Sequence, residues 1–303
     1  MQNNKLIVTR APHFFGSLNT TTIMRDVLIA LLPELIVSTV YLGRAALFRV
    51  LVCVLSCVGF EWAMRRILGR KQTVKDLSAA VTGVILAYLL PAKLPFYMCI
   101  MGCFIAIVIV KQLFGGLGQN FANPAATAWI ALLLSFPDRM TVDDTPIELF
   151  TNAGALPSNL AAFVGPVEGY IGQISVLALL AGGIYLVARK IIEPTIPLCY
   201  IATVGVISLV MGLDPVFHIC AGGVVFGAFY MATDPVTTPA LFPGKIIFGI
   251  GCGAFTMIMR LLCTFPNSMP FAILLMNIFT PHIDRFMRYL HFRKEDRDEA
   301  RLG

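Results

Sequence analysis

The chain has 303 residues, of which 57% are hydrophobic and 13% are charged. A soluble globular domain is about 45–50% apolar and about 25% charged, so this composition excludes an ordinary soluble domain and predicts an integral membrane protein. The net charge of +6 does not indicate nucleic-acid binding, because most basic residues fall between apolar stretches where loops would meet the cytoplasm. No hydrolase, kinase or phosphate-loop motif is present.

The N-terminal segment, residues 1–23, has no apolar core like that of a cleavable signal peptide, so we expect the first span to direct insertion. Ten apolar stretches follow, several of them shorter than the about 20 residues that a crossing helix needs. They cover approximately residues 24–43, 46–64, 77–91, 96–111, 123–136, 169–188, 196–212, 215–231, 245–263 and 268–280.

Charge in the loops predicts the orientation of these spans. With a cytoplasmic N-terminus, 18 of the 23 Lys and Arg residues fall on the inner side and 5 on the outer side. Cytoplasmic loops carry such an excess, so we expect an even number of spans with both termini cytoplasmic. The chain then forms a single membrane domain over residues 1–303, with a cytoplasmic tail at 284–303 and a long extracytoplasmic loop at 137–168. Loops of this length are often functional.

Two stretches share an unusual plan, in which Asn and Pro precede a short apolar run that ends at Pro. They are residues 115–137 and 265–281, and each follows a small-residue span, 78–91 or 219–235. Inverted repeats with short or interrupted segments at matching positions indicate a site near the membrane midplane. We therefore predict an all-α polytopic membrane protein with about ten transmembrane helices in two inverted five-helix repeats, with short or broken helices. Chance likeness between small-residue helices is the alternative.

Three polar side chains within apolar surroundings are candidates for a functional site. Glu34 lies near the middle of the first span, where an ionisable residue indicates function, here ion coupling, although packing as a neutral acid is an equal alternative. Asn120 and Asn123 carry both donors and acceptors, which suit a neutral heterocycle such as an isoalloxazine. Asn123 before Pro124 is also a good helix N-cap, and both roles are compatible.

Other polar residues have simpler interpretations. Arg49 and Arg260 lie toward the outer ends of their spans, where long side chains reach the interface, and His218 fits a satisfied core residue. Eight cysteines include no CxxC; Cys53/Cys57 and Cys99/Cys103 each share a helix face, and packing is favoured over an iron–sulfur or metal site. No residue is predicted to be catalytic by itself or to bind a metal.

Four motifs in order carry a family resemblance. They are APHFFGSLNTTTIMRDVLIALLP, GGLGQNFANPAATA, FYMATDPVTTP and FTPHIDRF. Together they resemble the RnfD subunit of the Rnf ferredoxin:NAD electron-transport complex and, more distantly, the NqrB subunit of the sodium-pumping NADH:quinone reductase. The resemblance covers essentially the whole chain. It implies a ten-span flavoprotein of the bacterial or archaeal cytoplasmic membrane, with one FMN attached covalently through a threonine phosphoester and a riboflavin within the bundle.

The resemblance also implies site residues. The family's attachment motif corresponds to Val142-Asp143-Asp144-Thr145-Pro146-Ile147, which makes Thr145 the expected site of covalent FMN. The small-residue lead-in of the family motif is replaced by two aspartates, which repel an incoming phosphate. Asn120 and Asn123 match the family's paired asparagines and are assigned to riboflavin. Asp234-Pro235 matches a cytoplasmic loop motif, which makes Asp234 a further cofactor-binding candidate, with ion binding and a structural turn as the alternatives.

The predicted function is a flavin-carrying subunit of an ion-translocating oxidoreductase, a translocase that passes electrons between ferredoxin-side and NAD-side partners while Na⁺ or H⁺ moves outward. The implied partners are integral and peripheral subunits, including an FMN-carrying subunit on the outer side and iron–sulfur subunits, together with membrane lipid. The alternatives are a channel or transporter without a redox role, and a flavin-free scaffold subunit of the same complex.

Overall fold

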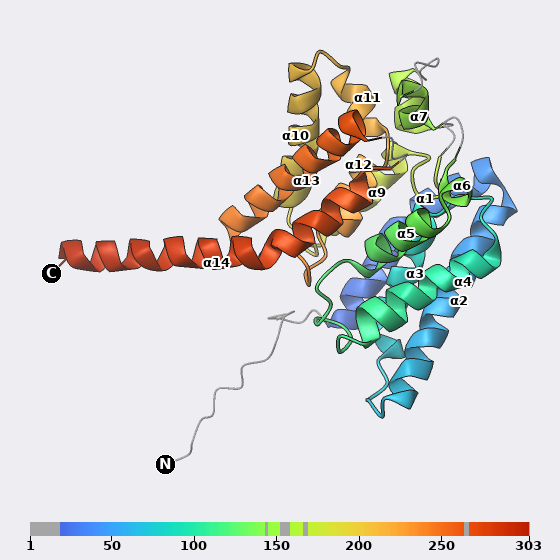
Figure 1. Ribbon diagram of the computed structural model, residues 1–303, viewed down its shortest axis with the longest axis horizontal. Helices are drawn as coiled ribbons and strands as arrows, with labels where there is room; N and C mark the ends of the chain where they lie inside the picture. Colours follow the sequence, from blue (N-terminus) through green and yellow to red (C-terminus); the bar gives the residue numbers. More distant parts are fainter. Residues whose placement is uncertain (1–18, 143–144, 152–157, 166–168, 264–266, 303) are drawn as a thin grey trace.

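The computed structural model describes residues 19–142, 145–151, 158–165, 169–263 and 267–302. Within these residues the regular secondary structure is helical apart from one isolated bridge between Pro91 and Tyr170, so the predicted all-α class is confirmed. The helices form two groups that meet along α1 and α9. The N-terminal part of α14 packs on α13 and α5, and its C-terminal part extends away from the bundle (Figure 1). Residues 1–18 lie outside the described part, so the expected N-terminal segment is largely untested.

The first group begins with two long helices, α1 (Thr20–Leu42) and α2 (Arg44–Ile67), separated by Gly43 at φ 78°. A short 3-10 turn, η1 (Val74–Asp76), leads into α3 (Ser78–Leu89). The fourth helix is regular as α4 (Phe96–Phe104) and then widens into a π-helix, η2 (Ile105–Gln112). The group ends with α5 (Pro124–Ser135), which is only 12 residues long, as the Asn-Pro stretch predicts.

The predicted outer loop, residues 137–168, contains short helices of its own. They are α6 (Pro137–Met140), α7 (Pro146–Thr151) and α8 (Asn159–Val164). Asp143 and Asp144 lie outside the described residues.

The second group comprises α9 (Val176–Ala188), α10 (Thr195–Val210), α13 (Phe242–Leu262) and α14 (Met269–Leu302), with a broken helix between α10 and α13. That helix consists of α11 (Pro215–Cys220), α12 (Val224–Phe226) and the π-helix η3 (Gly227–Met231). The predicted continuous run over 215–231 is therefore interrupted, at Gly222 and Gly223, which have φ values of 63° and 67°. Left-handed backbone is accessible mainly to glycine, so both residues permit the break.

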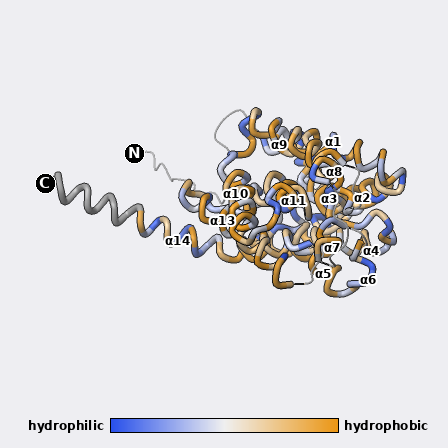
Figure 2. Tube along the Cα trace, turned by 90° about the horizontal axis from the view of Figure 1, so that it is seen from above, coloured by the Kyte–Doolittle hydropathy of each residue, from blue (hydrophilic) through white to orange (hydrophobic). Residues whose placement is uncertain are grey.

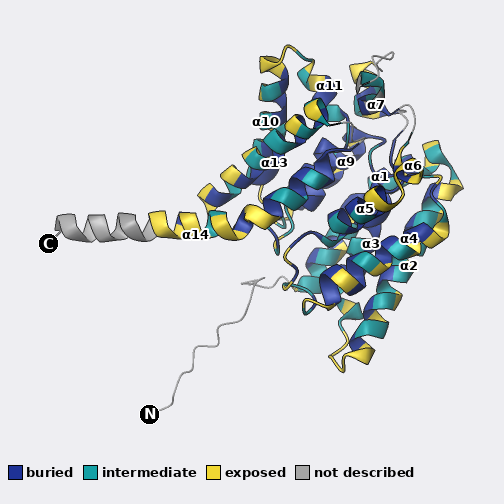
Figure 3. Cartoon of the chain, in the orientation of Figure 1, coloured by how far each residue is buried: buried dark blue, intermediate teal, exposed yellow. Residues whose placement is uncertain are grey.

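Two boundaries differ from the sequence prediction. The stretch 169–175 is not helical, so the predicted span 169–188 begins at Val176. The C-terminal helix does not stop at Pro281 but continues to Leu302. Pro281 is exposed, and most residues from there to Leu290 are exposed as well, so little tertiary packing opposes a local distortion of the helix at the proline (Figure 3).

By length and composition, two helices in the described part could cross a membrane, α2 and α13. Shorter apolar helices accompany them: Ser78–Leu89, Phe96–Gln112, Pro124–Ser135, Val176–Ala188 and Thr195–Val210. Hydrophobic residues cover the outside of the bundle as well as its inside (Figure 2), and Val210 and Leu262 are 80% and 79% exposed. A soluble protein rarely exposes so much apolar surface, so lipid or protein partners must cover it.

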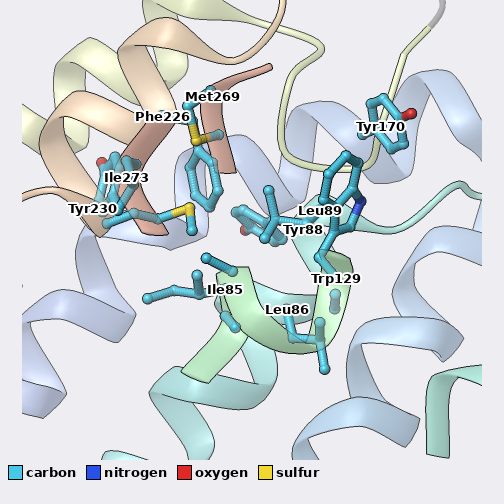
Figure 4. Packing of buried hydrophobic residues seen from close by; sticks show 14 of the residues in the cluster. Ile85, Leu86, Tyr88, Leu89, Trp129, Tyr170, Phe226, Tyr230, Met269 and Ile273 are labelled. Carbon is cyan, nitrogen blue, oxygen red and sulfur yellow. The ribbon is translucent and has the colours of Figure 1, made fainter. Parts of the chain in front are cut away.

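The buried core joins the two groups. Figure 4 shows Tyr88 from the first group beside Phe226 from the second, with ring centroids 5.8 Å apart. The ring centroid of Trp129 lies 6.2 Å from that of Tyr170 and 5.9 Å from that of Phe271. The helices α1 and α9 approach closely, because a Cβ atom at Gly182 would overlap the carbonyl oxygen of Ala30. Small residues allow such close contact between helices in a membrane.

Candidate functional site

A cavity lies where the two helix groups meet at the end of the bundle that carries the predicted cytoplasmic loops. Its empty volume is about 940 Å³, including the part open to solvent. Its wall is mostly apolar, from residues such as Ile85 and Phe229, with a few polar side chains. The polar residues that line it are Ser78, Thr82, Lys111, Asn120, Asn123, Tyr230, Thr233 and Asp234. A large apolar pocket with few polar groups is the usual form of a cofactor site.

Three of the residues predicted from the sequence meet in this cavity: Asn120, Asn123 and Asp234. Asn123 caps α5, because its side-chain oxygen accepts hydrogen bonds from the backbone nitrogens of Ala125 and Ala126 at 3.0 and 3.2 Å. Its amide nitrogen donates across the cavity to the carbonyl of Met231 at 3.4 Å. The cap role is thus confirmed, and the same side chain joins the two helix groups at the cavity wall.

Asp234 occupies the turn that follows η3. Its carboxylate accepts hydrogen bonds from the Val236 backbone nitrogen at 3.3 Å and the Thr237 hydroxyl at 3.2 Å. Burial raises the pKa of Asp234 above its ordinary value, while these two hydrogen bonds and the positive charge of Lys111 oppose the rise. The motif residue therefore has both a structural role in the turn and a position at the cavity.

Sequence reasoning missed the charged pair beside the cavity. Lys111 lies at the end of η2 and is 2% exposed; its ammonium donates to Glu61 at 3.0 Å and to the Ser78 hydroxyl at 2.6 Å. Glu61 also accepts from Thr73 at 2.6 Å. The orientation prediction treats Lys111 as a loop charge and does not single out Glu61, although two opposite charges within apolar runs are the available signal.

Glu34 is fully buried on α1, and it lies outside the lining of this cavity. One carboxylate oxygen accepts from the backbone nitrogens of Ile174 and Ser175 at 3.0 and 3.4 Å. The Ser38 hydroxyl lies within hydrogen-bond distance of three acceptors: the carbonyl of Ile171, the backbone carbonyl of Glu34 and one carboxylate oxygen of Glu34. The other carboxylate oxygen has no partner among the described atoms. The non-helical stretch 169–175 thus supplies the donors that hold this acid.

Thr145 lies in a separate, smaller cavity near the outer loop, and the structure does not bring it next to Asn120 or Asn123. This cavity has an empty volume of about 380 Å³. It is lined by Thr145, Pro146, Ile147, Ala162, Gly169, Tyr170, Gln173, Cys220, Ala221 and Gly222. Thr145 itself is buried, so it contributes to the cavity wall and is withdrawn from bulk solvent.

The expectation for Arg260 was wrong. Its side chain does not reach the interface but is 3% exposed, with its guanidinium bound to the carbonyls of His218 at 2.7 Å and Ala221 at 3.0 Å. Arg49 is partly buried and donates to the carbonyl of Leu94 at 2.7 Å. A break in α11–α12 leaves carbonyls that need donors, and this need draws Arg260 inward.

The four cysteines of the first helix group, Cys53, Cys57, Cys99 and Cys103, are fully buried, and Cys103 donates to the carbonyl of Cys53 at 3.4 Å. In the part of the chain that the structure describes, no three His, Cys, Asp or Glu side chains are arranged to hold a metal ion.

Comparison with known proteins gives one consistent answer. Residues 7–293 match the model of the NQR2, RnfD, RnfE family. The RnfD subunit of a Na⁺-translocating ferredoxin:NAD⁺ oxidoreductase complex from Acetobacterium woodii is 44% identical, over 95% of both chains. The corresponding subunit of a proton-translocating complex from Clostridium ljungdahlii is 37% identical over 96% of this chain and 97% of its own. The corresponding subunit of an ion-translocating oxidoreductase complex from Stutzerimonas stutzeri is 36% identical over 88% and 90%.

Proposed function

The chain belongs to the NQR2, RnfD, RnfE family, and we propose that it is the flavin-carrying RnfD membrane subunit of an ion-translocating ferredoxin:NAD⁺ oxidoreductase complex. In this function it passes electrons between ferredoxin-side and NAD-side partners while Na⁺ or H⁺ crosses the membrane. The observation that carries the proposal is the cavity that gathers Asn120, Asn123 and Asp234 from both helix groups in a chain of this family.

The residues of this cavity fit the isoalloxazine ring of a riboflavin. The ring is flat and largely apolar, and its edge alternates hydrogen-bond donors and acceptors. The cavity offers apolar walls at Ile85 and Phe229, the amides of Asn120 and Asn123, and the ammonium of Lys111. Bound flavin would supply one- and two-electron transfer that no side chain here can perform. The chain's own part is to orient the ring and exclude water.

The cavity at Thr145 fits the second flavin attachment, because Thr145 lines it together with Gln173, whose buried Nε2 donor has no hydrogen-bond partner. Attachment requires a separate flavin transferase and a flavin adenine dinucleotide donor. In that transfer the Thr145 oxygen would replace AMP on the phosphorus of the FMN half, with the pyrophosphate bond broken, AMP released and the hydroxyl proton passed to a base. Because Thr145 is buried, we propose that esterification precedes docking of the outer loop.

Ion coupling is proposed for Glu34. A buried carboxylate with one oxygen held by backbone nitrogens and the other unpartnered can take up a proton or contribute to a cation site. The Ile171 carbonyl, which accepts from Ser38, lies in the same group of polar atoms.

Ten spans in two inverted repeats, with both termini cytoplasmic in a bacterial or archaeal inner membrane, remain part of the proposal. Corresponding elements support the repeat. Short helices α3 and α12 each begin after a residue in left-handed conformation, Leu77 at φ 63° and Gly223 at φ 67°. The first helices of the halves, α1 and α9, pack on each other. We further propose partner subunits that carry FMN on the outer side and iron–sulfur clusters.

Flavin analysis of the purified chain tests the proposal. We expect in-gel flavin fluorescence that survives denaturation and is abolished in Thr145→Ala, and a second flavin without phosphate that is released on denaturation. A chain that carries neither flavin, when produced together with its transferase and partner subunits, contradicts the proposal and favours a transporter or a flavin-free scaffold.

A further inference from the structure

The outer end of the second helix group holds a buried positive charge. Arg260 on α13 is 3% exposed, and its Nε atom has no hydrogen-bond partner. Among the described side chains, no Asp or Glu lies within ion-pair distance of it. A buried cation without a counter-charge is strongly unfavourable, so its position calls for a function beyond the two carbonyls that it binds.

This charge lies directly behind the wall of the Thr145 cavity. A Cβ atom at Gly222 would be 2.6 Å from Nη2 of Arg260 and 2.9 Å from Ile147. Gly222 and Ile147 both line the cavity that contains Thr145. Only the backbone of Gly222 therefore separates the guanidinium of Arg260 from the cavity. A side chain at position 222 would push Arg260 and Ile147 away.

A second donor lines the same cavity without a partner. The Nε2 atom of Gln173 is buried and makes no hydrogen bond. Its side chain packs against the break between α11 and α12, because a Cβ atom at Gly223 would be 2.6 Å from this nitrogen. Among the described residues, an orphaned N–H donor in the cavity and a buried cation behind its wall give this place a surplus of positive partial charge. That surplus suits an anion with several acceptor oxygens and disfavours a metal ion.

We propose that Arg260 and Gln173 form the receptor for the phosphate group carried by Thr145. The inference rests on the proposed covalent flavin and adds the residues that hold its charge. Arg260 supplies the counter-charge to the phosphodiester, and Gln173 donates to one of its oxygens. The anion in turn neutralises Arg260, so attachment of flavin stabilises the outer end of the second helix group and fixes the loop around Thr145.

A purely structural role for Arg260 makes a different prediction. Its bonds to the His218 and Ala221 carbonyls would cap α11 whether or not flavin is attached. Loss of the side chain would then lower stability equally with and without flavin. A thermodynamic cycle between position 260 and the flavin therefore separates the two roles.

The experiment uses the full chain in detergent, produced with a flavin transferase. Four proteins are compared: the unmodified chain, Thr145→Ala, Arg260→Gln, and the double variant. Covalent flavin is measured by in-gel fluorescence, and thermal unfolding is followed with a thiol-reactive fluorophore, since Cys53, Cys57, Cys99 and Cys103 are fully buried. We expect flavin to raise the melting temperature of the unmodified chain by on the order of 2–4 °C and to raise it little or not at all when Arg260 is absent.

Arg49→Gln is the matched control, because Arg49 also binds carbonyls near the predicted outer surface but, unlike Arg260, is not among the nearest neighbours of Gly222 in the wall of the Thr145 cavity. It should leave the stabilisation by flavin intact. Should Arg260→Gln fail to fold, Gln173→Glu and Gln173→Met replace it. The glutamate repels the phosphate and should lower the yield of covalent flavin at least severalfold, whereas the methionine should reduce only the gain in melting temperature.

The outcomes are distinguishable. Equal stabilisation by flavin with and without Arg260, together with normal flavin yield in Gln173→Glu, overturns the receptor and leaves the covalent flavin standing. Absence of covalent flavin in the unmodified chain overturns both. Loss of the flavin-dependent stabilisation in Arg260→Gln, with Arg49→Gln unaffected, supports the receptor.

Discussion

The ammonium of Lys111 lies 3.0 Å from the carboxylate of Glu61, and the two side chains are 3% and 0% exposed. This ion pair links η2 to α2 beside the larger cavity. Both charges are shielded from water, and Glu61 has a second cationic neighbour in Arg65, whose Nε lies 3.8 Å from its carboxylate.

Replacing Glu61 alone should lower the stability of the protein more than replacing Glu61 and Lys111 together. Glu61→Met leaves Lys111 without a carboxylate and is expected to cost about 3–5 kcal/mol of stability. Lys111→Met should cost less, because Arg65 still lies 3.8 Å from Glu61, and the double variant should recover part of the loss of Glu61→Met. Thermal unfolding of the purified chain measures all three. Single variants that unfold at the same temperature as the unmodified chain would contradict this account.

Glu34→Gln should uncouple ion movement from electron transfer. The amide can still accept from the Ile174 and Ser175 nitrogens, so the fold is preserved, but it carries no charge and takes up no proton. In vesicles containing the intact complex we expect ion accumulation to fall at least about tenfold, with flavin content unchanged. Glu193→Gln, which alters an exposed pair with Lys245, is the control. Unchanged pumping in Glu34→Gln would remove Glu34 from the pathway.

The two asparagines can be tested without destroying the helix cap. Asn123→Asp keeps the oxygen that caps α5 but loses the amide donor to Met231, and Asn120→Leu removes the second amide from the cavity wall. Both should lower the amount of flavin released on denaturation, while covalent flavin at Thr145 stays constant. Asn123→Ala is less informative, because loss of the cap alone costs about 1 kcal/mol. Full riboflavin content in both informative variants would show that the ring binds elsewhere.

Close packing of α1 on α9 predicts a steric effect. Gly182→Ala places a methyl group against the Ala30 carbonyl and the Tyr230 hydroxyl, so it must separate the two helices and should lower the yield of folded protein severely. Gly59→Ala provides the comparison, because no atom lies within 4 Å of a Cβ there. In that open helical position alanine should be neutral or stabilise by about 0.5–1 kcal/mol. Size-exclusion profiles in detergent would reveal the difference.

The raised pKa of Asp234 predicts how the stability of the folded protein changes with pH. Because burial raises its pKa in the folded protein, the folded state keeps its proton at a pH where the unfolded chain has released it. Stability should therefore increase as pH falls through the folded pKa toward the ordinary value of 3.8, and should decrease as pH rises through that window. Melting temperature against pH, compared with Asp234→Asn, isolates this contribution. A profile that is identical in the variant would contradict it.

Local chemistry made part of this molecule predictable. Asn123 followed by Pro124 is an N-cap followed by a helix start, and α5 begins there. The family resemblance assigned Asn120 and Asn123 to riboflavin and left the role of Asp234 open. Their meeting in one cavity has no local signal in the sequence, because Asp234 is remote from both asparagines in the chain. Glu34 was visible from its apolar surroundings, and it is buried.

What failed depended on tertiary contacts. Hydropathy indicates how deep Arg260 lies in the membrane but not which way its side chain points, so the sequence suggests an interfacial arginine. The broken helix at Gly222 instead supplies the carbonyls that bind its guanidinium. The helical prediction for 169–175 failed for a related reason. This apolar segment forms hydrogen bonds with Glu34 and with the carbonyls of Tyr88 and Leu90, and those partners are remote in sequence.

The segment 169–175 contacts both the Thr145 cavity and the carboxylate of Glu34. Tyr170 and Gln173 form its face toward the Thr145 cavity, and the backbone of Ile174 and Ser175 forms its face toward Glu34. The two faces are therefore joined by a few consecutive residues of non-helical backbone. If a group in the outer cavity changed the proton or cation affinity of Glu34 through this segment, occupancy of Glu34 would have to change the affinity of the outer cavity by the same free energy.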